Sequence, residues 1–245
     1  MTAWPYPRWI AHRGAGNFAP ENTLGAFRLG AAHGYTMFEC DVKLSADGVP
    51  FLLHDSTLER TTDGRSTAGQ RPWAELAALD AGSWHSNAFA GERLPSLEAV
   101  ADCCLAQGWL LNIEIKPTPG TGALTGRVVA DAVARLWRNA RVMPLLSSFD
   151  VAALLAARAA QPQLPCGLLL SRLPEDWLAT AKKAKCVAVI CQHALWTDAV
   201  LAQAKAARLR TMSYTVNDAA TAKRLLAMGL DALITDRIDL FDPNA

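Results

Sequence analysis

The chain of 245 residues carries 24 basic and 23 acidic residues, and 51% of its residues are hydrophobic. This composition can bury a sizeable core and fits a single domain, expected to span residues 1–245. The balanced charge argues against broad nucleic-acid binding, which needs clustered cations. No signal-peptide pattern opens the sequence and no apolar run is long enough to span a membrane, so a cytoplasmic protein is expected.

Short apolar runs alternate with Ala- and Leu-rich segments of helical spacing along the chain. Eight runs are predicted strands: Trp9–His12, Met37–Val42, Leu110–Lys116, Pro144–Phe149, Cys166–Leu170, Val187–Cys191, Thr211–Val216 and Ala232–Thr235. Seven segments are predicted helices: the Ala/Leu run that follows Glu21-Asn22-Thr23 and extends to His33-Gly34, Ser96–Ala106, Gly126–Arg138, Val151–Ala160, Glu175–Ala184, Trp196–Ala207 and Asp218–Met228. This α/β alternation favours a TIM (β/α)8 barrel. A doubly wound open sheet is the alternative, because periodicity alone does not show closure.

Residues 55–95 interrupt this alternation. The stretch is rich in turn residues and has no sustained period. Long insertions of this kind are often functional lids or capping subdomains. We therefore expect a small insertion after the second strand, lying over the barrel mouth. Its aromatic residues Trp84 and Phe89, together with Phe149, are candidates for an apolar wall of a binding site.

Carboxylates occur in pairs at the ends of predicted strands. Glu39 and Asp41 are two residues apart, so their side chains point to one face of the strand. Glu114 and Lys116 repeat this spacing on the next barrel strand. Three carboxylates at strand ends suit a hard divalent cation such as Mg²⁺ or Ca²⁺. Solvated or salt-bridged acids are the alternative interpretation.

Two histidines are expected near this acidic cluster. His12 ends the first predicted strand, which neighbours the second strand in a barrel. Asp47-Gly48 indicates a two-residue hairpin turn, and counting back from that turn places His54 directly opposite Asp41. Both imidazoles would then lie beside the carboxylates.

Arg13 and Lys116 are candidate anion-binding residues, since a guanidinium or an ammonium group binds phosphate well. Together with a metal ion, these cations would neutralise charge that develops on a phosphate. A neutral imidazole can remove a proton from a nucleophile, and an imidazolium can protonate the leaving oxygen. The residues therefore indicate phosphodiester hydrolysis, and their spacing does not assign the acid and base roles.

Eight short motifs in chain order strengthen this interpretation. They are His12-Arg13-Gly14, Pro20-Glu21-Asn22-Thr23, Glu39-Cys40-Asp41-Val42, His54-Asp55, Leu94-Pro95-Ser96-Leu97-Glu98, Glu114-Ile115-Lys116, Thr215-Val216-Asn217 and Thr235-Asp236. From about residue 8 to residue 240 the chain resembles the glycerophosphodiester phosphodiesterases, most of all the bacterial cytosolic branch linked to glycerol 3-phosphate uptake.

The resemblance implies a TIM barrel with a small insertion after the second strand. It implies that Glu39, Asp41 and Glu114 bind a divalent cation, Mg²⁺ or Ca²⁺. It also implies that His12 and His54 form the catalytic acid–base pair.

For the substrate, the resemblance implies that Arg13 and Lys116 contact phosphate. Glu21 and Asn22 match the motif at the mouth of the first strand and are further substrate-binding candidates. Tyr214 stands where many family members have tryptophan, and its ring is a candidate for packing against glycerol carbons. The implied reaction hydrolyses small glycerophosphodiesters, such as glycerophosphocholine or glycerophosphoethanolamine, to glycerol 3-phosphate and an alcohol.

Two alternatives use the same barrel. A phospholipase-D-like or cyclising phosphodiesterase would act on lysophospholipids, although no amphipathic membrane helix is evident. A barrel that binds phosphodiesters without cleaving them would lack the histidines that this chain has. The sequence leaves the alcohol, the metal and the oligomeric state open, and a homodimer is a candidate assembly.

Overall fold

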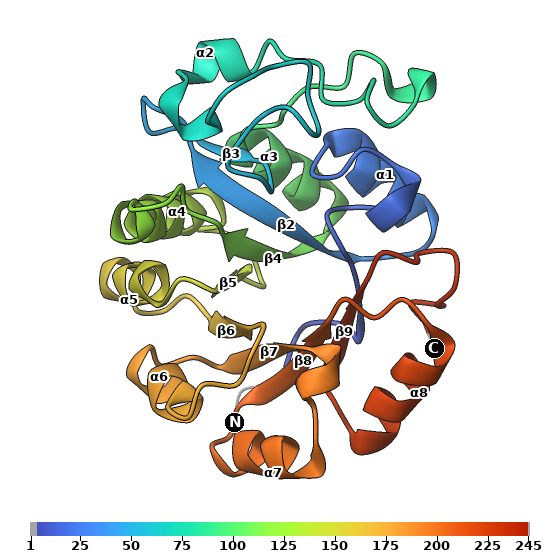
Figure 1. Cartoon of the computed structure of the whole chain (residues 1–245), viewed down its shortest axis with the longest axis vertical. Helices are drawn as coiled ribbons and strands as arrows, with labels where there is room; N and C mark the ends of the chain where they lie inside the picture. Colours follow the sequence, from blue (N-terminus) through green and yellow to red (C-terminus); the bar gives the residue numbers. More distant parts are fainter. Residues whose placement is uncertain (1–3, 245) are drawn as a thin grey trace.

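The first strand closes the sheet of this protein into a barrel. In the computed structural model, which describes residues 4–244, β1 (Trp9–Ala11) pairs in parallel with both β2 (Met37–Leu44) and β9 (Ala232–Thr235). The remaining barrel strands are β4 (Leu110–Ile115), β5 (Leu145–Ser148), β6 (Cys166–Leu170), β7 (Ala188–Gln192) and β8 (Arg210–Tyr214). They lie between β2 and β9 in chain order, which gives a closed eight-stranded parallel barrel (Figure 1). The predicted TIM barrel is confirmed, and the open sheet is wrong.

Helices cover the outside of the barrel (Figure 1). They are α1 (Leu24–Ala32), α3 (Leu97–Gln107), α4 (Gly122–Leu136), α5 (Val151–Ala160), α6 (Trp177–Lys183), α7 (Asp198–Ala206) and α8 (Ala219–Met228). Side-chain oxygens of five residues accept a backbone N–H at a helix start: Thr23, Ser96, Asp150, Thr197 and Asp218. Each such cap stabilises its helix by about 1 kcal/mol. None of the helices in residues 4–244 is long and apolar enough to cross a membrane.

Strand alternation divides the core into an inner and an outer layer. On β2, Met37 packs inside the barrel with Ile10, while Phe38, Cys40 and Val42 pack outside against the helices. Since side chains alternate between faces, the remaining odd-numbered residues of β2 point into the barrel. Glu39, Asp41 and Lys43 are therefore directed inward.

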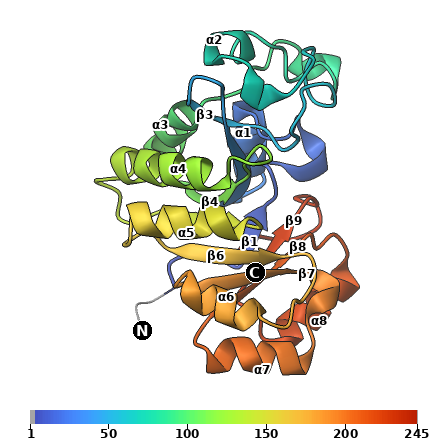
Figure 2. The same ribbon diagram turned by 60° about the vertical axis from the view of Figure 1, so that its left-hand side comes forward.

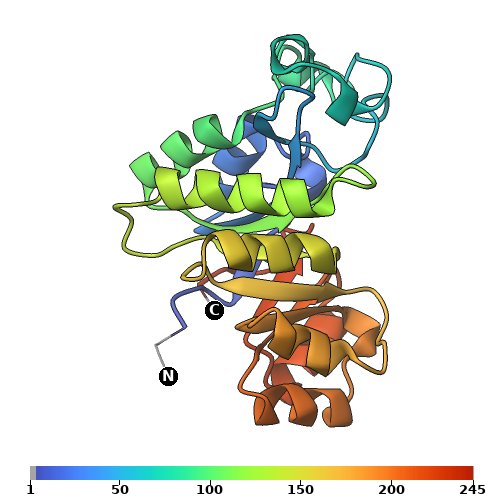
Figure 3. The same cartoon turned by 90° about the vertical axis from the view of Figure 1, so that its left-hand side faces the viewer.

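The insertion lies at one end of the molecule, next to α1 and α3 and far from α6–α8 (Figures 2 and 3). It contains α2 (Trp73–Leu76) and two short 3₁₀ turns, Ala68–Gln70 and Asn87–Phe89. The insertion has a small core of its own, formed by Phe51, Leu53, Leu58, Ala68, Leu76, Ala81 and Leu94. Phe51 and Leu53 come from the hairpin segment, so this core attaches the insertion to the barrel through β3 (Pro50–Leu52).

The hairpin between β2 and β3 differs by one residue from the predicted register. Ser45 and Val49 bracket a three-residue loop, in which Gly48 has a φ of +81° and its N–H donates to the Ser45 carbonyl at 3.0 Å. Lys43 consequently pairs with Phe51, and the Leu53 N–H donates to the Asp41 carbonyl at 3.0 Å. The prediction that His54 stands directly opposite Asp41 is wrong, because three-residue loops with a left-handed glycine also close hairpins.

Gly16 lies where the loop after β1 passes the loop after β9. Its φ is +54°, and a Cβ placed on it would lie 2.1 Å from the Asp236 carbonyl oxygen. The N–H of the next residue, Asn17, donates to that same carbonyl at 3.3 Å. A glycine is thus required for the two loops to approach, and this approach brings Asp236 next to the end of β1.

Replacing Gly16 with alanine tests this close approach. Left-handed strain and the backbone clash each cost about 1–3 kcal/mol, so Gly16→Ala should lower the free energy of unfolding by roughly 2–6 kcal/mol in urea denaturation. Gly91→Ala is the matched control, since Gly91 has a φ of +89° with no atom within 4 Å of the added Cβ. The control should lose only about 1 kcal/mol from backbone strain. Equal losses in both variants would contradict the close-approach account.

Candidate active site

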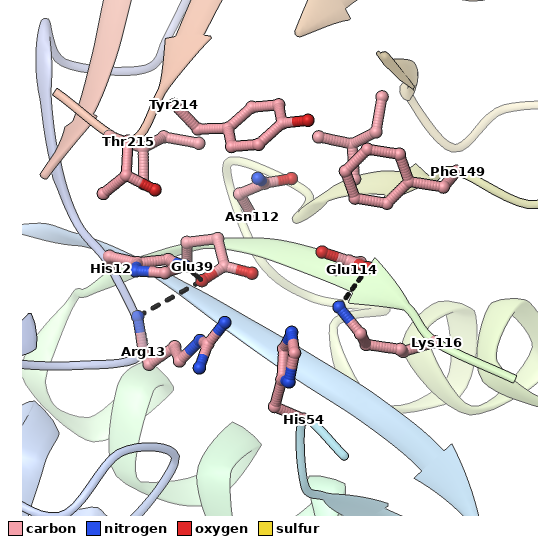
Figure 4. A pocket seen from close by; sticks show the side chains of 12 residues that line it. His12, Arg13, Glu39, His54, Asn112, Glu114, Lys116, Phe149, Tyr214 and Thr215 are labelled. Carbon is pink, nitrogen blue, oxygen red and sulfur yellow. Dashed lines mark hydrogen bonds and ion pairs between the residues drawn. The ribbon is translucent and has the colours of Figure 1, made fainter. Parts of the chain in front are cut away.

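A pocket of about 170 Å³ opens at the carboxyl ends of the barrel strands. Its lining residues are His12, Arg13, Glu39, His54, Asn112, Glu114, Lys116, Phe149, Leu169, Tyr214, Thr215 and Ile234. Figure 4 shows charged side chains and imidazoles on one side, with Tyr214 and Phe149 on the other. The pocket therefore has one polar wall and one largely apolar wall.

Three carboxylates form the centre of the polar wall. Oxygen atoms of Glu39, Asp41 and Glu114 all lie within 4.8 Å of one another. Asp41 pairs in register with Glu114 across β2 and β4, which places both on the inner face at the same level. The relative exposures of Glu39, Asp41 and Glu114 are 3%, 1% and 8%, so the cluster is buried as well as crowded.

The three carboxylates repel one another when all are ionised, and their pKa values reflect this repulsion. Burial and the nearby Asp41 carboxylate raise the pKa of Glu114 to about 7 and hold that of Glu39 well above its ordinary value. For Asp41, burial is outweighed by Lys116 and Arg13, so the pKa of this carboxyl lies below its ordinary value. Closely spaced hard oxygen donors that repel one another when ionised fit a divalent cation. These residues are thus able to hold the metal ion that the sequence suggested.

Each pocket histidine is bound to a carboxylate through Nδ1. His12 Nδ1 lies 2.6 Å from Asp236 Oδ1, and His54 Nδ1 lies 2.6 Å from Asp55 Oδ1. A carboxylate partner requires Nδ1 to carry a proton, which leaves Nε2 as the basic nitrogen of the neutral ring. His12 Nε2 is 3.7 Å from a carboxylate oxygen of Glu39. For His54, burial lowers the pKa of the imidazole and thus favours the neutral ring.

Asp236 and Asp55 hold the two pocket imidazoles, and the sequence reasoning did not single them out although both occur in its motifs. Asp236 is fixed by Asn217, whose Nδ2 donates to Asp236 Oδ2 at 2.8 Å. No sequence spacing links Asp236 to His12, since barrel closure alone brings β9 beside β1. Asp55 follows His54 directly in the sequence. This adjacency is the signal from which the contact between the two side chains could have been predicted.

The two candidate phosphate-binding cations contact the carboxylate cluster. Lys116 Nζ lies 2.9 Å from Glu114 Oε1 and 3.3 Å from Asp41 Oδ1. Arg13 Nε lies 3.4 Å from Asp41 Oδ2, and the Arg13 N–H donates to Glu39 at 3.2 Å. Arg13 has a φ of +51°, a costly conformation for a residue with a side chain. Both side chains line the pocket, as the sequence suggested.

Glu21 and Asn22 lie behind the pocket wall and do not line it. Asn22 Nδ2 donates to Asp41 Oδ2 at 2.9 Å, and Asn22 Oδ1 accepts the Asp41 N–H at 3.0 Å. Glu21 accepts a hydrogen bond from Arg13 Nη1 at 2.9 Å. Both side chains thus hold other site residues, Arg13 and Asp41, and substrate contact by Glu21 or Asn22 stays a prediction.

Aromatic rings form the opposite wall. Phe149 and Tyr214 meet edge to face with ring centroids 5.7 Å apart, and Phe149 is 40% exposed. The Tyr214 hydroxyl donates to the Leu170 carbonyl at 3.1 Å, so the phenol is anchored to β6 and its ring lies along the pocket. None of the described insertion residues 55–95 lines the pocket, so Trp84 and Phe89 are not part of this wall.

Asn112 is a pocket residue that the sequence reasoning did not single out. It lies on β4 opposite Glu39, and Figure 4 shows its amide between the two walls. Both its Nδ2 and its Oδ1 are buried without a hydrogen-bond partner among the described residues. An unpaired buried amide is costly, which indicates that a ligand or water completes its hydrogen bonds.

Comparisons with known proteins agree with this geometry. Residues 12–240 match the model of the glycerophosphoryl diester phosphodiesterase family. The chain is 30% identical over 234 residues to a glycerophosphodiester phosphodiesterase of Caldanaerobacter subterraneus subsp. tengcongensis, covering 93% of each chain. It is 32% identical over 235 residues to the protein YhdW of Bacillus subtilis (strain 168), covering 94% of each.

A solved structure is also similar. It is an Oleispira antarctica phosphodiesterase in complex with the product sn-glycerol-3-phosphate. The two chains superpose with a TM-score of 0.87 at 33% identity, over 94% of this chain and 93% of that one.

Thermal denaturation with divalent cations tests the carboxylate cluster. A cation that binds only the folded protein at one hundred times its dissociation constant stabilises by about 2.7 kcal/mol, or roughly 5–10 °C in Tm. Mg²⁺ or Ca²⁺ should therefore raise the Tm of the unmodified protein. Glu39→Gln should lose most of this response, while its metal-free Tm should not fall, because a repelling charge is removed from the cluster.

Glu98→Gln is the control for this experiment, since Glu98 is exposed and paired with Arg135 on the surface. Its response to the cation should equal that of the unmodified protein. An undiminished response in Glu39→Gln would show that the cation binds elsewhere.

Proposed function

Since the chain belongs to the glycerophosphoryl diester phosphodiesterase family and is thus a phosphoric diester hydrolase, we propose that it cleaves small glycerophosphodiesters with a divalent cation and two histidines. Glycerophosphocholine and glycerophosphoethanolamine are the proposed substrates, with glycerol 3-phosphate and an alcohol as products. The product bound to the Oleispira antarctica relative supports this choice.

The observation that carries the proposal is the arrangement of the two imidazoles. His12 and His54 line one pocket together with Glu39 and Glu114, and each has its Nδ1 bound to a carboxylate. Because Nδ1 of each ring is engaged by a carboxylate, Nε2 is the nitrogen that would exchange protons with the reacting groups. One imidazole removes a proton from the attacking oxygen, and the other, as imidazolium, protonates the leaving oxygen.

Glu39, Asp41 and Glu114 would hold Mg²⁺ or Ca²⁺, supported by their closeness and by the repulsion between their ionised carboxylates. When bound, such an ion supplies Lewis-acid stabilisation of the phosphate charge that grows in the transition state. The ion would also relieve the repulsion among the buried carboxylates.

Arg13 and Lys116 would bind the phosphate oxygens. Both cations line the pocket and are held near Asp41 at 3.4 and 3.3 Å, so they are already oriented when substrate arrives. Preorganised positive groups stabilise developing charge without a reorganisation cost at the moment of reaction.

The carbon skeleton of the substrate would pack against Tyr214 and Phe149. The two rings form the apolar wall facing the charged groups (Figure 4). Because the Tyr214 hydroxyl is bound to the Leu170 carbonyl, the ring face, and not the hydroxyl, is the substrate-binding element.

Release of glycerol 3-phosphate from glycerophosphocholine and glycerophosphoethanolamine tests the proposed activity. The unmodified protein should release it with Mg²⁺ or Ca²⁺ and lose activity with a chelator. His12→Asn and His54→Asn should each lower kcat by about 10²–10⁴-fold, the usual contribution of a positioned acid or base.

His33→Asn is the matched control, since His33 ends α1 and does not line the pocket. It should retain the activity of the unmodified protein. Near-normal turnover in both pocket variants would reject the two-histidine mechanism, and no release from either substrate would reject the proposed substrate class. A cyclic phosphate as final product would favour the cyclising alternative.

The anchoring of Tyr214 gives a separate prediction. Tyr214→Phe should change kcat/KM by less than about threefold, because the ring wall is kept, whereas Tyr214→Ala should raise KM by about tenfold. Steady-state kinetics with glycerophosphocholine distinguish the two variants. A large loss in Tyr214→Phe would instead indicate that the hydroxyl contacts substrate.

A further inference from the structure

Arg60 bridges two loops that carry site residues. It belongs to the insertion, and its guanidinium contacts two carboxylates at once. Its Nε and Nη2 donate to Asp55 at 2.6 and 3.0 Å, and its Nη1 and Nη2 donate to Glu21 at 2.7 and 2.8 Å. The Arg60 guanidinium thus donates four hydrogen bonds to two acids that are 34 residues apart in the sequence.

Each of these acids in turn holds a residue that lines the pocket. Asp55 Oδ1 lies 2.6 Å from His54 Nδ1, and Glu21 Oε1 accepts a hydrogen bond from Arg13 Nη1 at 2.9 Å. These side-chain contacts are continuous. They run from His54 through Asp55, Arg60 and Glu21 to Arg13. Arg60 itself does not line the pocket.

The support of His54 differs from the support of His12. Asp236, the carboxylate that binds His12, is also held by Asn217 at 2.8 Å. For Asp55, His54 and Arg60 are the side-chain partners in the described part of the chain. The hydrogen bonds from Arg60 hold the pKa of Asp55 below its ordinary value, so this carboxylate stays ionised.

We propose that Arg60 is a positioning residue, through which the insertion orients His54 and Arg13 together for phosphodiester cleavage. The inference rests on the proposed function of these two residues. It assigns the insertion a role in catalysis although none of its described residues lines the pocket. The planar guanidinium suits this role because it binds two carboxylates in fixed geometry, whereas a lysine ammonium is a single point of charge.

The test compares Arg60→Met and Arg60→Lys with Arg71→Met. Arg71 is also an insertion arginine, but its ion pair is with exposed Glu75 at 3.2 Å on the surface. Both Arg60 variants should lose about 10–100-fold in kcat/KM, the usual loss when the partner of a site residue is removed. Arg71→Met should keep the unmodified value. Equal losses in Arg60→Met and Arg71→Met, or none in Arg60→Met, would overturn the proposal.

A double-mutant cycle tests whether Arg60 acts through Asp55. If the two residues belong to one chain of contacts, Asp55→Asn combined with Arg60→Met should lose less than the product of the two single losses. Independent, multiplicative losses would overturn the proposed route to His54.

Histidine NMR gives a readout that does not depend on turnover. At fixed pH, the imidazole resonances of His54 in isotope-labelled protein should shift in Arg60→Met, while those of His12 stay unchanged because Asp236 and Asn217 hold that ring. General unfolding would move the resonances of all five histidines. Unchanged His54 resonances would overturn the positioning role, whatever the substrate of the enzyme proves to be.

Discussion

Three buried carboxylates at one end of the barrel are the constraint on which the site depends. Glu39, Asp41 and Glu114 are brought together by strand alternation and by the pairing of β2 with β4. Like charges so close in a buried place are costly unless cations compensate them. Arg13 and Lys116 do so in part, and the Asn22 amide fixes Asp41. The remaining negative charge is what a divalent cation would neutralise.

The second organising feature is the pairing of each imidazole with a carboxylate. His12 is oriented by Asp236 from the last strand, so the chain must close its barrel before this pair exists. His54 is oriented by Asp55, whose position depends on Arg60 of the insertion. The barrel and the insertion therefore each contribute the carboxylate that orients one imidazole, Asp236 and Asp55. The aromatic wall of Phe149, which follows β5, and Tyr214 of β8 completes the pocket.

Much of this arrangement follows from sequence patterns that act over short distances. The period-two spacing of Glu39 and Asp41 was sufficient to place them on one face, and strand–helix alternation favoured the barrel over an open sheet. Closure itself depends on the pairing of β1 with both β2 and β9, which leaves no periodic signal. The hairpin register was not predicted, since Asp47-Gly48 fits both a two-residue turn and a three-residue loop that ends in a left-handed glycine. The contact of His12 with Asp236 and that of Glu21 with Arg60 were also not predicted, because contacts between distant loops leave no periodic signal.

Anomalous diffraction from crystals of the protein grown with Mn²⁺ tests the central claim most directly. Manganese takes the oxygen ligands that suit magnesium and calcium, and its anomalous signal locates it without reference to activity. We expect one strong peak among the carboxylates of Glu39, Asp41 and Glu114 and no comparable peak in Asp41→Asn crystals. A strong peak elsewhere, or an empty carboxylate cluster at saturating Mn²⁺, would contradict this account.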